Sequence, residues 1–225
     1  MAGDTVMMEQ SVFDRSQSEG KEIGASTYNL LIGLVLCWGF FVNYWMVLNI
    51  PVASIQAINQ WVFFIGYFAC CFLGIYLFNS SDNPAVSFVG YNLVVVPFGL
   101  VINLVVSQYD PRLILEAIKV TGMVTLLMMC MGAMFPQFFR KIGGALTVAL
   151  VAVIIVELVM IFVFKTHQSW LDWAVVLIFC GYIGYDWARA NQIPKTVDNA
   201  IDSAAALYMD IINLFLRILR IMGRK

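Results

Sequence analysis

The stretch GGALTVALVAVIIVELVMIFVF, residues 143–164, decides the fold class, because its 22 side chains are almost all apolar. Its only charged residue is Glu157. A helix rises about 1.5 Å per residue, so a stretch of this length crosses the roughly 30 Å of hydrocarbon in a lipid bilayer. These residues are therefore predicted to form a transmembrane helix.

The rest of the chain repeats this pattern. Hydrophobic residues make up 61% of the 225 residues and charged residues 12%, and the mean hydropathy is +0.85, which is typical of helices that face lipid. Further apolar stretches of spanning length occupy residues 28–50, 61–79, 86–107 and 113–135. A sixth span begins near Trp170 and passes through Asp186, and a semi-hydrophobic seventh runs from Ser203 to Met222.

These stretches predict an all-α integral membrane protein, with a seven-transmembrane-helix bundle in one domain over residues 27–225. The connections are short, and Asn83-Pro84 and Asp110-Pro111 are typical turn signals between spans. Residues 1–26 are polar and of mixed charge, so we expect a flexible cytoplasmic tail rather than a cleaved signal peptide.

Composition also excludes several classes of function. The net charge of −1 lacks the basic surplus of a nucleic-acid binder, so the expected constant partner is the lipid bilayer. The single histidine, His167, leaves too few ligands for a zinc-dependent membrane hydrolase. Residues 203–222 contain no lysine that could hold retinal as a Schiff base. We therefore expect neither an enzyme nor a bound cofactor.

Charges in the connections predict the orientation. Basic residues tend to stay in the cytoplasm, and three connections on one side carry them: Arg15 and Lys21, Arg140 and Lys141, Arg189 and Lys195. The N-terminus is thus predicted to be cytoplasmic, and seven spans would leave the C-terminus outside. The C-terminal end is nevertheless basic, with Arg217, Arg220, Arg224 and Lys225. Either the last helix is re-entrant, or tertiary packing overrides the charge rule.

Charged side chains within the spans are costly, so they need a partner, a proton or water. Glu157 is predicted to be protonated or bonded to another helix, and a functional and a structural role are equally open. Asp172 and Glu116 lie near helix ends and are interpreted as reaching interfacial water. Lys119 follows Glu116 by three residues on the same helix face and is predicted to pair with it.

Asp186 and Asp210 are the strongest candidate pair, for a geometric reason. The sixth helix is expected to end before Pro194, and the seventh to start with Asp202 or Ser203 as its cap. Each aspartate then lies about eight residues, or roughly 12 Å, from the turn, so the two carboxyls would meet at equal depth.

Two bare carboxylates in a poorly solvated site repel each other, so such a pair can share one proton. The pair is either a proton-sensitive latch or a hydrogen bond that only fastens two helices. Asn213 and Arg217 follow Asp210 at positions i+3 and i+7, which gives the seventh helix a polar stripe towards the bundle interior. The seventh helix is therefore predicted to be central.

The segment ALYMDIINLFLRILRIMG, residues 206–223, together with Tyr185-Asp186, resembles the Bax inhibitor-1 family, also called the transmembrane BAX inhibitor motif family. Asn83-Pro84 and Gly99-Leu100 agree with this resemblance, which covers roughly residues 61–223. It implies six helices around a central seventh, and a pH-sensitive calcium leak. The family's sensor, an aspartate pair on helices six and seven, maps onto Asp186 and Asp210.

The implied role fits the chemistry of the pair, since carboxylates are hard oxygen ligands that suit calcium. Calcium would be the transported ion, with Asp186 and Asp210 as proton sensor, ion pathway and calcium ligands. Some bacterial members hold the latch with an arginine at the end of helix two. This chain has Asn79, Ser80 and Ser81 there, and Glu157 is a candidate for part of the missing polar network.

The sequence offers two alternative classes of function. A non-conducting protein that regulates a membrane protease or a cell-death partner would use the aspartates only structurally. A secondary transporter would show internal repeats or broken helices, and neither is evident. The chain ends without an ER-retention signal, which favours a bacterial inner membrane over an organelle.

Overall fold

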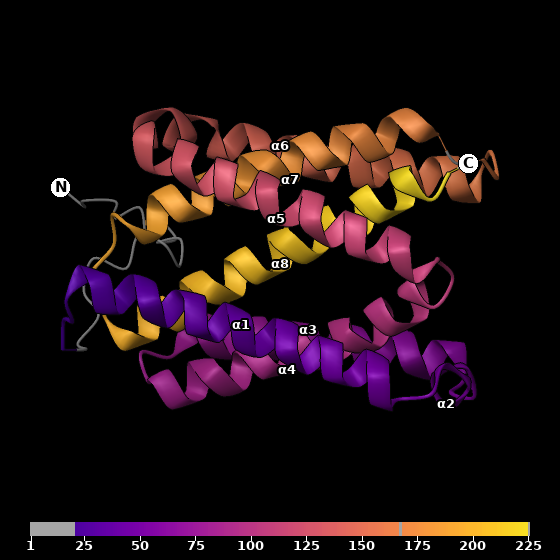
Figure 1. Ribbon diagram of the computed structural model, residues 1–225, viewed down its shortest axis with the longest axis horizontal. Helices are drawn as coiled ribbons and strands as arrows, with labels where there is room; N and C mark the ends of the chain where they lie inside the picture. Colours follow the sequence, from indigo (N-terminus) through magenta and orange to yellow (C-terminus); the bar gives the residue numbers. More distant parts are fainter. Residues whose placement is uncertain (1–20, 167, 225) are drawn as a thin grey trace, which may run out of the picture.

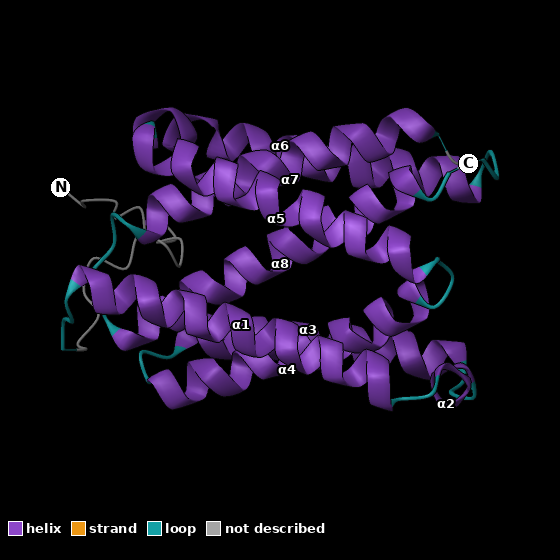
Figure 2. Ribbon diagram, viewed as in Figure 1, coloured by secondary structure: helices purple, strands orange, loops and turns teal. Residues whose placement is uncertain are grey.

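The computed structural model describes residues 21–166 and 168–224, and within that part of the chain it contains helices and no strands (Figure 2). The all-α prediction is confirmed. Arg15, His167, Lys225 and most of the predicted tail lie outside the described residues. The helices are α1 (Ala25–Asn49), α2 (Val52–Gln56), α3 (Gln60–Ser80), α4 (Pro84–Val106), α5 (Pro111–Met134), α6 (Pro136–Phe162), α7 (Ser169–Ala190) and α8 (Val197–Met222).

Six of these helices, α1 and α3 to α7, are long and apolar enough to cross a membrane. They match the first six predicted spans to within a few residues, except that α6 begins earlier, and the protein is a multi-pass membrane protein. The last helix, α8, falls short by composition because Asp198, Asp202, Asp210, Arg217 and Arg220 interrupt its apolar residues. The seventh span therefore stays a prediction.

Local chemistry explains where the helices begin. The side chain of Asn83 accepts a hydrogen bond from the Ala85 N–H, and Pro84 occupies the first turn of α4. Asp110 caps α5 in the same way, with Pro111 as the first residue. Both side chains satisfy backbone donors that a helix start leaves open, and the predicted turn signals are confirmed.

The predicted boundary between the last two helices was wrong. The α7 helix ends at Ala190, and Thr196 rather than Asp202 or Ser203 caps α8, accepting a hydrogen bond from the Asn199 N–H. Hydropathy missed the first turns of α8 because they contain polar residues. Those turns are nevertheless buried in protein, with Asp198 only 1% exposed.

The helices form two groups, with α8 running diagonally between them (Figure 1). One group contains α1, α3 and α4, and the other contains α5, α6 and α7. The α8 helix contacts α1 and α4 on one side and α5 and α7 on the other. The groups are therefore joined through the most polar of the long helices.

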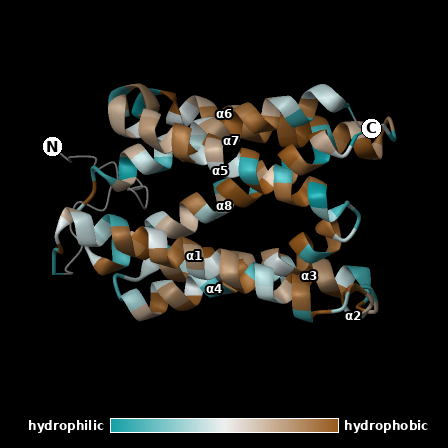
Figure 3. Cartoon of the chain, in the orientation of Figure 1, coloured by the Kyte–Doolittle hydropathy of each residue, from teal (hydrophilic) through white to brown (hydrophobic). Residues whose placement is uncertain are grey.

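Burial and hydropathy run in opposite directions in this bundle. The α6 helix is the most apolar candidate span, yet only Phe139 and Gly143 of its residues are buried. Apolar residues cover the outer helices (Figure 3), where lipid is the expected solvent. The buried interior is instead where the polar side chains of α8 find partners.

The start of α1 and the α7–α8 connection lie at the same end of the bundle (Figure 1). The backbone N–H of Ile23 donates to the Lys195 carbonyl at 2.8 Å, which joins the two segments. Of the predicted tail, residues 21–26 are described, and Ala25 and Ser26 already belong to α1.

Candidate functional site

The charges of α8 are sorted along its length. Acidic residues lie between its start and its middle, at Asp198, Asp202 and Asp210, and basic residues lie in its last turns, at Arg217 and Arg220. This order complements the helix dipole, which favours anions at the start and cations at the end. It also places two different polar sites on one helix, which contact α7 at two depths.

The first site is the pair of Asp186 on α7 and Asp210 on α8. Both residues are buried, with 9% and 7% exposed, and their carboxyls lie close enough to share a hydrogen bond. A hydrogen bond between two carboxyls requires a proton on one of them, because a carboxylate only accepts. Contact between these two carboxyls is therefore favourable only when one of them carries a proton.

The two aspartates come together although they do not lie at equal distances from the connection between α7 and α8. Asp186 lies four residues before the end of α7, whereas Asp210 lies thirteen residues after the start of α8. That difference of nine residues corresponds to about 13 Å of helix. The connection over residues 191–196 and the diagonal course of α8 (Figure 1) take up the difference.

The surroundings of the pair are polar on the α7 side. The Arg189 guanidinium interacts electrostatically with Asp186 and donates a hydrogen bond to the Tyr185 hydroxyl at 3.0 Å. Tyr182, one turn before Asp186, interacts electrostatically with both aspartates. Its hydroxyl donates a hydrogen bond to the Thr147 hydroxyl on α6 at 3.1 Å. Only Arg189 among these groups favours a charged pair.

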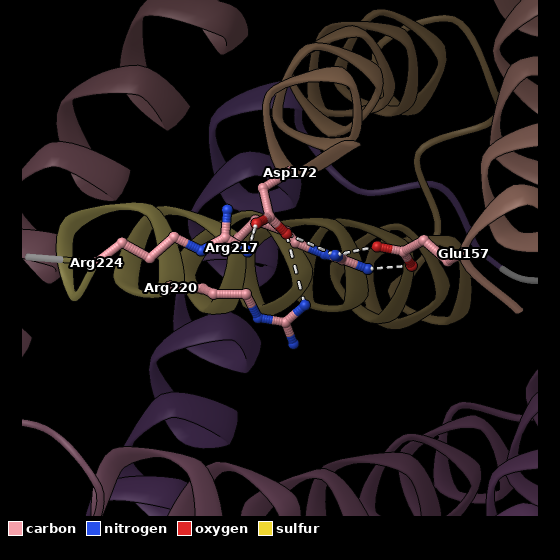
Figure 4. Close-up of polar contacts among 5 residues, drawn as sticks. All are labelled: Glu157, Asp172, Arg217, Arg220 and Arg224. Atoms are coloured by element: carbon pink, nitrogen blue, oxygen red, sulfur yellow. Dashed lines mark hydrogen bonds and ion pairs between the residues drawn. The ribbon is translucent and has the colours of Figure 1, made fainter. Parts of the chain in front are cut away.

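The second site is an ion-pair cluster, which we define as Glu157, Asp172, Arg217, Arg220 and Arg224 (Figure 4). Arg217 binds Glu157 through both guanidinium ends, with Nη2 2.7 Å from Oε2, and Nη1 also donates to Asp172 Oδ1 at 2.8 Å. Asp172 contacts Arg220 at 3.5 Å and Arg224 at 2.5 Å. The cluster ties the end of α6 and the start of α7 to the end of α8.

The sequence predicted the environment of one acid in this cluster and missed that of the other. Glu157 was predicted to be either protonated or bonded to another helix, and it pairs with Arg217 of α8. Asp172 was wrongly expected to reach interfacial water, since it is 0% exposed and holds three arginines. The spacing of Arg217 and Arg220 at i and i+3 was the available signal, because two arginines on one helix face within a span need acidic partners.

Asn213, predicted in the same polar stripe, lies between the two sites along α8. Its amide donates to the Met209 carbonyl of its own helix at 2.7 Å, so the bond that the structure gives it is local. Further polar bonds fasten α8 to the other helix group. Ser87 on α4 donates to Asp198 at 2.6 Å, and Asn43 on α1 donates to the Tyr208 hydroxyl.

Among the described residues, no cluster of three or more His, Cys, Asp or Glu side chains offers a closed metal site. Calcium prefers six to eight oxygen ligands, so the two carboxylates of Asp186 and Asp210 would need water to complete its shell. At the end of α3, Ser80 donates to the Tyr76 carbonyl of its own helix, where an arginine latch would otherwise begin.

Comparison with known proteins adds independent information. A family model described as "Inhibitor of apoptosis-promoting Bax1" matches residues 21–225. A Schizosaccharomyces pombe protein named Bax inhibitor 1 is 34% identical over 130 residues, which cover 56% of this chain and 47% of the yeast protein. The chain thus matches about half of the length of that relative.

Bacterial proteins match more evenly. A Helicobacter pylori protein is 29% identical over 175 residues, which cover 76% of this chain and 75% of that protein. A Vibrio cholerae protein, described as a membrane protein, is 30% identical over 148 residues, covering 64% and 65% of the two chains. Similarity to membrane proteins agrees with the six apolar helices of this chain.

Proposed function

Because this chain belongs to the Bax inhibitor-1 family, we propose that it is a pH-sensitive passive calcium leak whose gate is the Asp186–Asp210 pair. The observation that carries the proposal is the buried contact between these two carboxyls. One proton there separates a mutually attractive state of α7 and α8 from a mutually repulsive one.

The gating step follows from electrostatics. With one proton shared, the pair carries one negative charge and a hydrogen bond, and α7 stays against α8. Loss of that proton leaves two carboxylates in contact in a poorly solvated interior, where like charges repel strongly. The helices then part, water enters, and both carboxylates become oxygen ligands for calcium.

The closed state does not need an arginine at the end of the second long helix. Arg189, one turn after Asp186, partly offsets the charge of the pair. The ion-pair cluster holds the far end of α8 to α6 and α7. Opening would therefore separate α7 and α8 only around the Asp186–Asp210 pair, while the ion-pair cluster keeps the end of α8 in place.

We extend the proposal to the topology. In it, α8 is the central seventh span of a bundle in a bacterial inner membrane, the N-terminus is cytoplasmic and the C-terminus is outside. The basic C-terminal turns oppose this orientation less than their sequence suggests, because Asp172 and Glu157 form ion pairs with the three arginines. The positive-inside rule counts charges exposed near the membrane surface rather than paired ones.

The test is calcium flux into proteoliposomes across a pH series. We expect flux through the unaltered chain to rise as pH rises, and Asp186→Asn and Asp210→Asn to remove that dependence, because neither variant keeps a pair of titratable acids. Glu116→Gln, which changes an exposed acid, is the matched control and should behave like the unaltered chain. Identical flux and pH dependence in all four proteins would refute the proposal.

A second candidate is a non-conducting regulator of a membrane protein partner, such as a protease or a cell-death protein. The description of the matching family model as an inhibitor of an apoptosis-promoting protein favours it. In that case the aspartates only fasten α7 to α8. A stoichiometric partner found by crosslinking in native membranes, together with no flux in liposomes, would establish this candidate over the leak.

A further inference from the structure

A cavity of about 260 Å³ lies where the ends of α6 and α8 meet the start of α7, at the end of the bundle opposite to the α7–α8 connection (Figure 1). Glu157 and Arg217 of the ion-pair cluster line it. The cavity exceeds what a single water molecule needs, and it has room for a cation that keeps several waters. The proposed gate gives this cavity no role.

The cavity is connected to the aspartate pair by one face of α8. Asp210, Asn213 and Arg217 share this face at positions i, i+3 and i+7, and Arg217 reaches the cavity wall. Asp210 and Arg217 are about 10 Å apart along the helix. Asn213, between them, is only partly buried. Polar side chains thus mark a course from the pair to the cavity.

An ion that passes the pair must still leave the bundle at this end. The helices are tied together here, because Arg217 of α8 is paired with Glu157 of α6 and with Asp172 of α7. Separation of α7 from α8 around the aspartates therefore does not by itself open the end of the bundle. The cavity beside the ion pairs offers a way past this fixed end.

Glu157 is the one acid that lines the cavity, within the part of the chain that the structure describes. Arg217 binds both of its carboxylate oxygens, with Nη2 2.7 Å from Oε2, and reaches between the carboxylates of Glu157 and Asp172 (Figure 4). The Glu157 and Arg217 side chains are 16% and 18% exposed. The guanidinium offsets the charge that would draw a cation to Glu157, so an ion that enters is attracted only weakly.

The remaining wall contributes little charge of its own. Met160, Ile161 and Leu171 are apolar, and Thr166 adds a neutral hydroxyl. Arg220 also lines the cavity and is ion-paired with Asp172 at 3.5 Å. The Glu157–Arg217 pair is therefore the place where a change of one side chain alters the attraction of the cavity for cations in either direction.

We infer that this cavity is the outer mouth of the leak, and that the balance of charge between Glu157 and Arg217 sets how readily a divalent cation enters it. This inference rests on the proposed function, since the ion that uses the mouth is the one that the aspartate gate releases. It adds a second determinant of flux, which acts on the rate of entry rather than on the gate.

Calcium flux into proteoliposomes tests the charge balance, at a pH at which the unaltered chain leaks. Glu157→Gln leaves the Arg217 charge at the mouth and should lower flux about tenfold, whereas Arg217→Gln leaves the Glu157 charge and should raise it about tenfold, because one unit of charge at close range acts strongly on a divalent ion. Both variants break the same ion pair. A purely structural effect would therefore change flux in the same direction in both.

A variant that fills the cavity tests the route without changing any charge. Met160→Trp places a large side chain in the cavity wall and should lower calcium flux. Leu158→Trp, on the same helix at a residue that is 48% exposed and does not line the cavity, is the matched control and should leak like the unaltered chain.

A measurement that needs no flux separates failure of the mouth from failure of the gate. Lipid-reconstituted Met160→Cys and Leu158→Cys are treated with a water-soluble thiol reagent, and the unaltered chain gives the background from its five cysteines. Since a thiol reacts as the thiolate, which forms in water, Met160→Cys should be modified several times faster than Leu158→Cys.

Flux changes of opposite sign in Glu157→Gln and Arg217→Gln, together with faster modification of Met160→Cys, would support the outer mouth. Changes of the same sign, or equal modification of the two cysteine variants, would overturn it and leave the aspartate gate standing. Absence of flux through the unaltered chain at every pH would refute the proposed function and the outer mouth with it.

Discussion

Two polar contacts fasten α8 to α7, and they work in opposite ways. The Asp186–Asp210 contact joins two groups of like charge, whereas the ion-pair cluster joins two acids to three arginines. Asp210 and Arg217 are only seven residues apart, or about 10 Å along the helix. The first contact depends on a proton, and the second needs none.

In the proposed mechanism, one helix is anchored at its end and responds to pH at its middle. Arginine stays charged at any physiological pH, so the attraction within the cluster does not depend on a shared proton. The aspartate pair has no such permanent counter-charge on α8. A change in pH should therefore act on the middle of α8 while its end stays fixed.

The largest expected effect is loss of the anchor. Arg217→Met leaves Glu157 without its guanidinium partner and removes one partner of buried Asp172, which should lower the free energy of unfolding by about 3–5 kcal/mol. Denaturation in detergent micelles measures this loss, with Arg112→Met as the control at an exposed arginine. Equal stability of the two variants would show that the ion-pair cluster does not anchor α8.

The next effect is a slope of stability with pH. In the proposed mechanism the folded pair keeps a proton that aspartates of the unfolded chain have already released above about pH 4. Stability should therefore fall as pH rises above that value, by about 1.4 kcal/mol per pH unit for one proton, until the folded pair loses its proton as well. Unfolding of the unaltered chain and of Asp210→Asn should be compared over the same pH series. An unchanged pH dependence of stability in Asp210→Asn would mean that other groups cause it.

A smaller effect is expected for Asp210→Asn at acidic pH. The asparagine amide can donate to Asp186 as the shared proton did, so the free energy of unfolding should change by no more than about 1 kcal/mol. Thermal unfolding at low pH measures it. A loss as large as that of Arg217→Met would mean that the pair is an anchor like the cluster.

The smallest effect belongs to an ion pair outside both contacts. Lys119 and Glu116 pair at 2.9 Å as predicted, but both side chains are 55% exposed. Lys119→Gln should therefore change stability by less than about 1 kcal/mol. A larger loss in the same denaturation assay would show that exposure is a poor guide to the strength of ion pairs in this protein.

Sequence reasoning reached the parts of the fold that face lipid. A stretch such as residues 143–164 has no alternative solvent, so composition and length were enough to place it in the membrane. The start of α8 was missed because Asp198 and Asn199 look like a loop by hydropathy, although tertiary packing buries them. Short α2 was also not predicted, since five residues carry little periodic signal.

The candidate site was predicted unevenly for a similar reason. Asp186 and Asp210 stood out because their stretches are apolar and sequential helices tend to pack together, and the structure brings their carboxyls into contact. Asp172 did not stand out, because its distance from a helix end suggested water. Its actual environment depends on where the end of α8 arrives, which is a property of the whole bundle rather than of the local sequence.

The most direct measurement is an infrared titration of the carboxyl groups, because a protonated carboxyl has a C=O stretch distinct from that of a carboxylate. In lipid-reconstituted protein, we predict a protonated-carboxyl band near neutral pH that disappears as pH rises and is absent from Asp186→Asn/Asp210→Asn. Persistence of the same band in that double variant, or its absence from the unaltered chain at every pH, would contradict a proton held between α7 and α8.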